Sequence, residues 1–184
     1  MRVKRMSKWL SESELKTYLN SESILQWLLE DGSITQKISA DGAFRLEVIK
    51  DGLGLASLED YQAIDVFPQP IRIREVRLFR DDQAVVYAKS IIPFRTSWYG
   101  YPDLGSIGGK PLGELIFQSD IFIKQNCKFA KFSFEDKETV WGRRSNYLVN
   151  GYPFSIMEVF FCLLYTSDAA DDSLRVDLGG RRII

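Results

Sequence analysis

The sequence predicts a single α+β domain built on an antiparallel β-sheet. The N-terminal part carries helix-capping patterns, whereas from about residue 43 apolar residues alternate with polar ones, as they do in half-buried strands. The connections between the alternating segments are of hairpin length, which is typical of antiparallel pairing. With 184 residues, of which 45% are hydrophobic and 27% charged, the chain can form one domain with a substantial core.

Three short helices are expected first. Ser11 begins a capping-box pattern that marks the start of one helix. A second helix lies in "SESILQWLLEDG" (21–32), where Gly32 is the expected stop. Ser33 repeats the capping pattern, so a third helix is expected to begin at Ile34.

The strands follow the helices. The segment 43–52 alternates and ends at the turn pair Asp51-Gly52, and the segments 71–79 and 84–92 form a hairpin around a short turn. The remaining expected elements are a glycine-rich loop that enters a short helix near Pro111 (108–117) and further strands at 121–134, 145–154 and 155–161.

The composition excludes several classes of function. A formal net charge of −1 offers no field that would collect nucleic acid or an anionic membrane surface. No apolar stretch approaches the ~20 residues of a membrane span, and no signal peptide is recognisable, so we expect a cytoplasmic protein without membrane insertion. The chain has no histidine and only two distant cysteines, so histidine-based catalysis and a zinc site are not expected.

Strand alternation places two charges on faces that are otherwise apolar. Arg74 shares its face of the strand with Val76 and Leu78, which makes that face the better candidate for the core. Glu158, in "FSIMEVFF" (154–161), points the same way as three large apolar residues. A buried charge is costly unless it is paired, hydrogen-bonded or neutralised.

Two interpretations of these charges remain open. Arg74 and Glu158 pair with each other as a structural ion pair across the sheet. Alternatively, they stand at opposite ends of an enclosed pocket, where the arginine takes a ligand carboxylate in a bidentate fork and the glutamate takes a hydroxyl proton. The ligand would then be a small acid with a hydroxyl group at its far end.

Four segments carry a family resemblance. They are "WLLEDGSITQKI" (27–38), "IREVRLF" followed by "AKSIIP" (73–93), "GGKPLGELIF" (108–117) and "WGRRSNYLVNGYPFSIMEVFF" (141–161). In these segments the chain resembles the chorismate lyase family, and the resemblance covers roughly residues 10 to 161. The resemblance implies an antiparallel sheet on which N-terminal helices and short flap helices cover an enclosed ligand pocket.

The resemblance also implies a site and a reaction. Arg74 falls on the family's ligand arginine, Glu158 on its terminal-strand glutamate, and Ile34 and Leu112 on the two residues that offer backbone groups. These positions imply that Arg74 meets the ring carboxylate of 4-hydroxybenzoate and Glu158 its 4-hydroxyl group. The implied enzyme is a monomer without metal or cofactor that converts chorismate to 4-hydroxybenzoate and pyruvate, the first committed step of ubiquinone biosynthesis, and is strongly inhibited by its product.

Some positions depart from the family's pattern or allow two roles. Ile34 stands where a methionine is familiar, and Ala88 stands where glycine is expected, so that its methyl group could tighten the pocket. Arg143 and Arg144 in "WGRRS" are candidates for assisting the enolpyruvyl carboxylate. The favoured interpretation is that at least one of them is a structural residue on the surface or in a turn.

The C-terminal segment and the alternatives to catalysis complete the expectations. We expect residues 1–161 to form the chorismate lyase-like domain, and "CLLYTSDAADDSLRVDLGGRRII" (162–184) to be a non-native tail, exposed and poorly ordered, that resembles a translated sequencing adapter. An alternative function is a non-catalytic domain of the same fold that binds an aromatic acid as an effector. A second alternative is a lyase that acts on a related enolpyruvyl acid.

Overall fold

The computed structural model describes residues 3–134 and 138–163 of the chain. The prediction of an exposed, poorly ordered tail therefore falls, from residue 164 onward, outside the described residues. Cys162, which the prediction assigned to that tail, is buried in the main hydrophobic cluster and belongs to a short helical turn, η3 (Phe161–Leu163).

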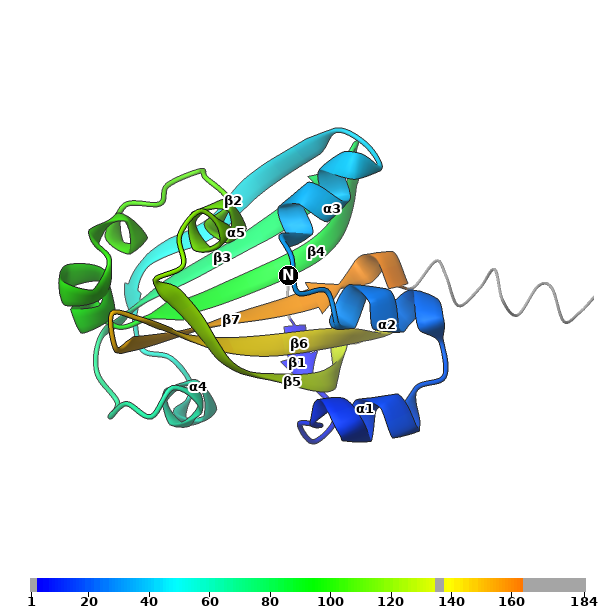
Figure 1. Cartoon of the computed structure of the whole chain (residues 1–184), viewed down its shortest axis with the longest axis horizontal. Helices are drawn as coiled ribbons and strands as arrows, with labels where there is room; N and C mark the ends of the chain where they lie inside the picture. Colours follow the sequence, from blue (N-terminus) through cyan, green and yellow to red (C-terminus); the bar gives the residue numbers. More distant parts are fainter. Residues whose placement is uncertain (1–2, 135–137, 164–184) are drawn as a thin grey trace, which may run out of the picture.

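One antiparallel sheet organises the described chain (Figure 1). Its spatial order is β1-β5-β6-β7-β4-β3-β2, and each pair of neighbours is antiparallel. The strands are β1 (Val3–Arg5), β2 (Phe44–Gly54), β3 (Ile71–Arg80), β4 (Gln83–Ile92), β5 (Phe122–Phe134), β6 (Glu138–Val149) and β7 (Tyr152–Phe160). The predicted α+β class is thus confirmed.

The helices lie on both faces of the sheet (Figure 1). They are α1 (Glu12–Tyr18), α2 (Glu22–Leu28), α3 (Ile34–Ala40), α4 (Leu58–Ala63) and α5 (Leu112–Phe117), with short turns η1 (Thr96–Gly100) and η2 (Pro102–Gly105). The capping box at Ser11 and the start of α3 at Ile34 are confirmed. Helix α4 was not predicted, although Ser57 and Asp60 form a complete capping box at its start.

Helix α2 ends earlier than predicted. Its last residue is Leu28, so Gly32 is not its stop. The carbonyl groups of Leu28 and Glu30 accept hydrogen bonds from Arg143 of β6. Because these carbonyls are turned toward the sheet, they cannot serve a further helical turn.

Two turns also differ from the prediction. Asp51-Gly52 is not a turn but part of β2, where the Asp51 carboxylate receives two hydrogen bonds of 2.7 Å from Arg72 of the neighbouring strand. The segment 145–154 is not one strand, because Asn150 and Gly151, both with positive φ, form the hairpin turn between β6 and β7. The hairpin of β3 and β4 is confirmed.

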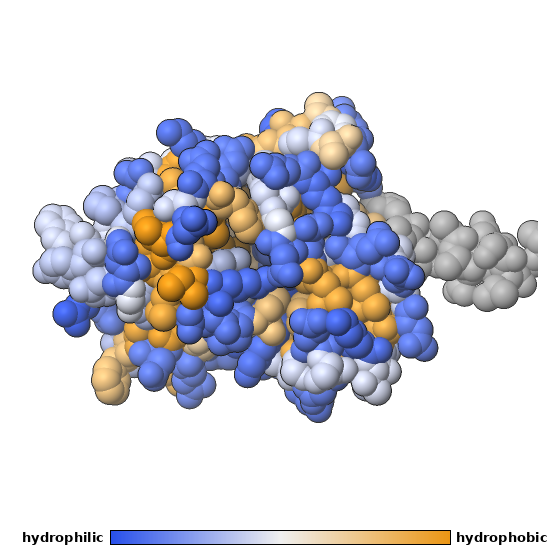
Figure 2. All heavy atoms as spheres, in the orientation of Figure 1, coloured by the Kyte–Doolittle hydropathy of each residue, from blue (hydrophilic) through white to orange (hydrophobic). Residues whose placement is uncertain are grey.

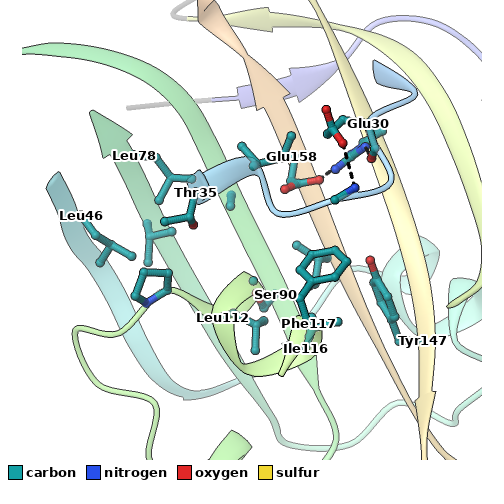
Figure 3. Close-up of a pocket in the computed structure, with 18 of the residues that line it drawn as sticks. Glu30, Thr35, Leu46, Leu78, Ser90, Leu112, Ile116, Phe117, Tyr147 and Glu158 are labelled. Atoms are coloured by element: carbon teal, nitrogen blue, oxygen red, sulfur yellow. Dashed lines mark hydrogen bonds and ion pairs between the residues drawn. The ribbon is translucent and has the colours of Figure 1, made fainter. Parts of the chain in front are cut away.

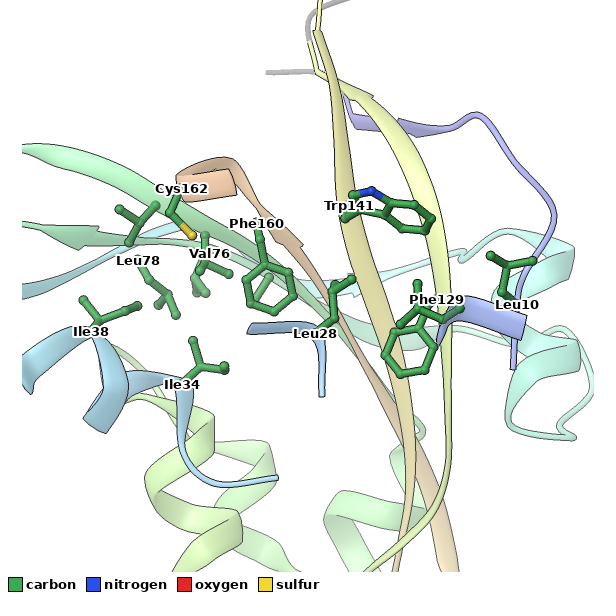
Figure 4. Close-up of a cluster of buried hydrophobic side chains, with 14 residues drawn as sticks. Leu10, Leu28, Ile34, Ile38, Val76, Leu78, Phe129, Trp141, Phe160 and Cys162 are labelled. Carbon is green, nitrogen blue, oxygen red and sulfur yellow. The ribbon is translucent and has the colours of Figure 1, made fainter. Parts of the chain in front are cut away.

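The core lies between the sheet and helices α2 and α3. Figure 4 shows Ile34 and Ile38 of α3 facing Val76 and Leu78 of β3, and all four side chains are buried. The predicted inner face of β3 is therefore confirmed. The opposite face of β3 packs on α4 through a second cluster that includes Ile73.

Candidate active site

Strand pairing brings Arg74 and Glu158 onto one face of the sheet. Arg74 lies opposite Ser90 of β4, and Ser90 lies opposite Ile156 of β7. Glu158 is two residues beyond Ile156 and so occupies the same face, one row further along the strands. With ~4.8 Å between strands and ~3.3 Å per residue, a flat sheet would separate the two α-carbons by about 12 Å. This spacing leaves room for a small ligand between the two side chains.

All four residues assigned from the family resemblance line one pocket between the sheet and its cover (Figure 3). The sheet contributes Arg74, Val76, Leu78, Ala88, Ser90, Arg143, Tyr147, Ile156 and Glu158, and the covering segments contribute Ile34, Thr35, Pro111, Leu112, Gly113, Ile116 and Phe117 among others. In Figure 3, Glu158 points into the space between the sheet and α5. Ala88, the position where glycine was expected, lies directly opposite Glu158 in the strand pairing.

The cover is built from the first residues of two helices. Ile34 begins α3 and Leu112 begins α5, and both side chains are buried. The helices meet closely there, since a β-carbon built on Gly113 would lie 3.4 Å from the hydroxyl oxygen of Ser33. The structure therefore places Ile34 and Leu112 together on the covering side of the pocket.

Arg74 is held in place by backbone carbonyl groups. Its side chain is only 2% exposed, and Nη2 donates hydrogen bonds to the carbonyls of Gly108 (3.0 Å) and Lys110 (2.8 Å). Burial lowers the pKa of the guanidinium, an effect that Asp51, 3.9 Å from Nε, partly offsets. Among the described residues, the buried Nε has no hydrogen-bond partner. Arg74 thus keeps donor capacity that a ligand carboxylate would satisfy.

Glu158 pairs with Arg143, not with Arg74. The Nε atom of Arg143 lies 2.6 Å from the Glu158 carboxylate, and the same side chain holds the carbonyls of Leu28 and Glu30. Burial alone would lower the pKa of Arg143, but the adjacent Glu158 reverses the effect and raises it above its ordinary value. The interpretation of Arg74 and Glu158 as a mutual ion pair is therefore wrong.

The favoured interpretation of the two neighbouring arginines is also corrected. Arg143 and Arg144 lie neither on the surface nor in a turn, because both are buried within β6. Arg143 lines the pocket, whereas Arg144 lies on the opposite face, over the ring of Trp9 and 3.4 Å from Glu59. Of these two arginines, Arg144 does not line the pocket and is the structural residue.

The position of Arg143 could have been predicted from the turn between β6 and β7. Asn-Gly is the strongest short hairpin signal, and a two-residue turn at Asn150 and Gly151 places Arg143 directly opposite Glu158, as the structure does. The predicted strand across residues 145–154 hid this register. Tyr147, also missed, lines the pocket with a phenol whose pKa is raised to about 12 by burial and by Glu158.

Two further observations concern the kinds of site the described residues contain. No helix within residues 3–134 and 138–163 combines the length and apolarity needed to cross a bilayer. In the same ranges, no three acidic, cysteine or histidine side chains come together as a metal site would require.

The fold and the pocket define a small α+β protein with a covered pocket whose lining includes Arg74, Arg143 and Glu158. The chain matches the chorismate lyase family over residues 3–170 and belongs to that family. It is 32% identical over 103 residues (49% of this chain, 55% of the relative) to "Probable chorismate pyruvate-lyase" of Psychromonas ingrahamii. It is 33% identical over 99 residues (50% and 54%) to "Probable chorismate pyruvate-lyase 2" of Pseudomonas entomophila. The chain spans about half the length of these curated relatives.

A solved structure shows the same fold. The "possible transcriptional regulator YydK" of Bacillus subtilis aligns with a TM-score of 0.50 at 12% identity, over 85% of this chain and 86% of that one. At this level of identity the likeness shows the fold alone. The predicted chorismate lyase-like fold is therefore confirmed.

Proposed function

We propose that the chain is a lyase that converts chorismate to 4-hydroxybenzoate and pyruvate. The observation that carries the proposal is the placement of Arg74 and Glu158 in one pocket without a contact between them. Each has its own fixed support, Arg74 in two backbone carbonyls and Glu158 in Arg143. Membership of the family supports the same reaction.

The two charges orient the ligand. Arg74 binds the ring carboxylate, with backbone groups of Ile34 and Leu112 at the covering side, and Glu158 accepts a hydrogen bond from the hydroxyl group on ring carbon 4. Valine, leucine and isoleucine side chains between them surround the ring. Because Glu158 already accepts a hydrogen bond from Arg143, its carboxyl oxygens are fixed as acceptors, which suits a hydroxyl group and not a second carboxylate.

The reaction needs little from the protein beyond this placement. The bond between ring carbon 3 and the ether oxygen breaks, the hydrogen on carbon 4 leaves as a proton, and the ring becomes aromatic. The ether oxygen leaves with the bonding electron pair as the enolate of pyruvate, which takes up a proton at its methylene carbon and becomes pyruvate. The residues hold the substrate in its reactive conformer and exclude water. This placement lowers the entropic and electrostatic parts of the reaction barrier without a metal or cofactor.

The finer features of this proposal follow from the cover over the pocket. A covered pocket with charges at both ends holds the product tightly, so we propose strong inhibition by 4-hydroxybenzoate and release through movement of the covering helices. We also propose that the enzyme acts as a monomer and that its product enters ubiquinone biosynthesis.

Turnover of chorismate by the full chain tests the proposal. Absorbance follows 4-hydroxybenzoate and a coupled assay follows pyruvate, and equal amounts of both are expected. Arg74→Gln and Glu158→Gln should each lower kcat/KM by at least about 100-fold. Arg77→Gln is the matched control, because Arg77 lies on the opposite face of the same strand and pairs with the half-buried Glu47. Equal losses in all three variants, or no turnover by the folded wild type, would contradict the proposal.

The second candidate is a domain that binds an aromatic acid without converting it. The fold shared with a protein described as a possible transcriptional regulator favours this alternative. It predicts tight binding of 4-hydroxybenzoate that depends on Arg74, together with no release of pyruvate from chorismate. The same two assays therefore separate the candidates.

A further inference from the structure

The pocket continues into a hollow on the surface. Asp31, Ile116, Phe117, Lys124 and Tyr147 line both spaces. The surface between α5 and α2 in Figure 1 is mainly hydrophilic in Figure 2, between two apolar areas. A polar substituent on a ligand in the pocket can thus extend toward solvent on this side.

Chorismate carries a group that its aromatic product lacks. The enolpyruvyl ether on ring carbon 3 ends in a second carboxylate and stands next to the hydroxyl group on carbon 4. If the hydroxyl group lies at Glu158, the enolpyruvyl carboxylate emerges at the same end of the pocket. A carboxylate there requires a cation with free donor capacity.

Two cations of the pocket contact the segment 30–31 after α2, Arg143 at the Glu30 carbonyl and Lys124 at the Asp31 carboxylate, and they differ in availability. Arg143 is 4% exposed, with Nε bound to Glu158 and Nη1 bound to two carbonyls. The Nζ atom of Lys124 lies 2.9 Å from Asp31, whose side chain is 91% exposed. The pKa of Asp31 is lowered by Lys124 and, more weakly, by Arg143, so both cations act near one point.

The ion pair of Lys124 is easily exchanged. Exposed pairs of this kind contribute little to stability, because water solvates the free carboxylate almost as well. The Lys124 side chain is itself 30% exposed and can follow a ligand. A carboxylate held in the pocket by two other anchors would compete well with the free side chain of Asp31.

We propose that Lys124 binds the carboxylate of the enolpyruvyl group of chorismate and releases Asp31 when it does so. The inference rests on the proposed function and adds a residue that distinguishes substrate from product. 4-Hydroxybenzoate has no group for Lys124, so Lys124 favours the substrate over the product in a pocket that otherwise fits both. Pyruvate then leaves through the hollow after the ether bond breaks.

The test compares two ligands in the full chain. Lys124→Gln should raise the KM for chorismate about 10- to 100-fold, the effect of one lost charge-assisted hydrogen bond, and change the Kd for 4-hydroxybenzoate less than about twofold. Lys124→Arg should restore most of the affinity. Lys128→Gln, an exposed lysine on the same strand outside the pocket, is the matched control and should leave both constants unchanged.

Several outcomes would overturn the role of Lys124. An unchanged KM in Lys124→Gln, or equal weakening of both ligands, would show that Lys124 is not a substrate contact. If the wild type binds chorismate without turnover, the proposed function fails, and the Kd for chorismate replaces KM in the same comparison. If the wild type binds neither ligand, both proposals are wrong.

Discussion

Glu158 and Arg143 form the central ion pair of the pocket at the scale of single residues. The carboxylate lies in a strand face that is otherwise apolar, and Arg143 stabilises its charge from the neighbouring strand. Arg143 in turn holds two carbonyls of the segment after α2. The pair therefore joins the orientation of Glu158 to the position of the covering segment.

Removing Arg143 alone should be severely destabilising. Arg143→Met leaves the partly buried Glu158 and two backbone carbonyls without their partner, and loss of one partner costs about 3–5 kcal/mol in buried pairs. The double variant with Glu158→Gln should lose less than the sum of the two single variants, because the uncompensated charge is gone. Urea unfolding gives the free energy of unfolding of the wild type, the two single variants and the double variant. A free energy of unfolding for Arg143→Met within about 0.5 kcal/mol of the wild type, the usual range for surface substitutions, would refute this account.

The sequence predicted the two ends of the site but not what fixes them. Alternation alone identified Arg74 and Glu158 as inward-facing charges, because a strand's period assigns each residue to a face. It could not pair them, since partners depend on register, and register depends on turns. Because the turn at Asn150 and Gly151 was missed, the pairing of Arg143 with Glu158 was not predicted.

The hairpin of β6 and β7 is the element on which the site depends most. Gly142 precedes Arg143 at a point where the two strands and Phe132 approach closely. A β-carbon built there would lie 2.6 Å from the carbonyl oxygen of Glu158 and 2.7 Å from the Phe132 ring. Any side chain at this position must displace the backbone that carries Glu158.

Gly142→Ala should therefore disturb both stability and binding. Overpacking of this kind costs about 1–3 kcal/mol, and the shift of Glu158 should weaken 4-hydroxybenzoate binding by at least about 10-fold. Gly52→Ala is the matched control, because Gly52 also lies in a strand but a β-carbon added to it would have no atom within 4 Å. Chemical unfolding and calorimetric titration give both quantities. Similar behaviour of the two variants would exclude a close approach at Gly142.

The segment between α2 and α3 should loosen in acid. Lys37 lowers the pKa of Glu30, and Lys124 lowers that of Asp31, so both carboxylates favour the fold when ionised; the exposed Asp31 contributes little, and Glu30 carries most of the effect. This contribution is complete above the unfolded pKa values of about 4, and it is lost as pH falls through the lower folded values. Glu30→Gln should be less stable than the wild type at pH 7, and this difference in stability should disappear below about pH 4. A difference in melting temperature that does not change with pH would contradict the stabilising role of the ionised Glu30.

Some elements with strong local signals were predicted, but not all of them. The capping patterns at Ser11 and Ser33 and the β3–β4 hairpin were found, whereas the capping box of α4 and the Asn150-Gly151 turn were missed. Strand β1 has only three residues and forms by pairing with β5, so no periodicity could reveal it. Asp51-Gly52 has the composition of a turn, but the ion pair with Arg72 and the pairing with β3 keep it extended.

On the scale of the whole molecule, both faces of the sheet are covered, and the site lies under one cover. The last described residues belong to the hydrophobic core under this cover, since Cys162 lies in one cluster with Phe160 and Ile38. The boundary between the family domain and the proposed non-native tail thus lies no earlier than Cys162. We propose that the remaining residues contribute neither to stability nor to the site.

Shortening the chain tests this boundary. A chain that ends at Leu163 should have the same melting temperature and the same affinity for 4-hydroxybenzoate as the full chain. A chain that ends at Phe161 should melt lower, because it lacks a buried side chain of the core. A marked loss of stability on removing residues 164–184 alone would show that the tail belongs to the domain.

A crystal structure of the full chain with 4-hydroxybenzoate tests the central claim most directly. We expect one ligand in the pocket, with its carboxylate on Arg74 and its hydroxyl group within hydrogen-bond distance of Glu158, which stays paired with Arg143. A ligand outside this pocket, or one bound with its hydroxyl group toward Arg74, would contradict the claim.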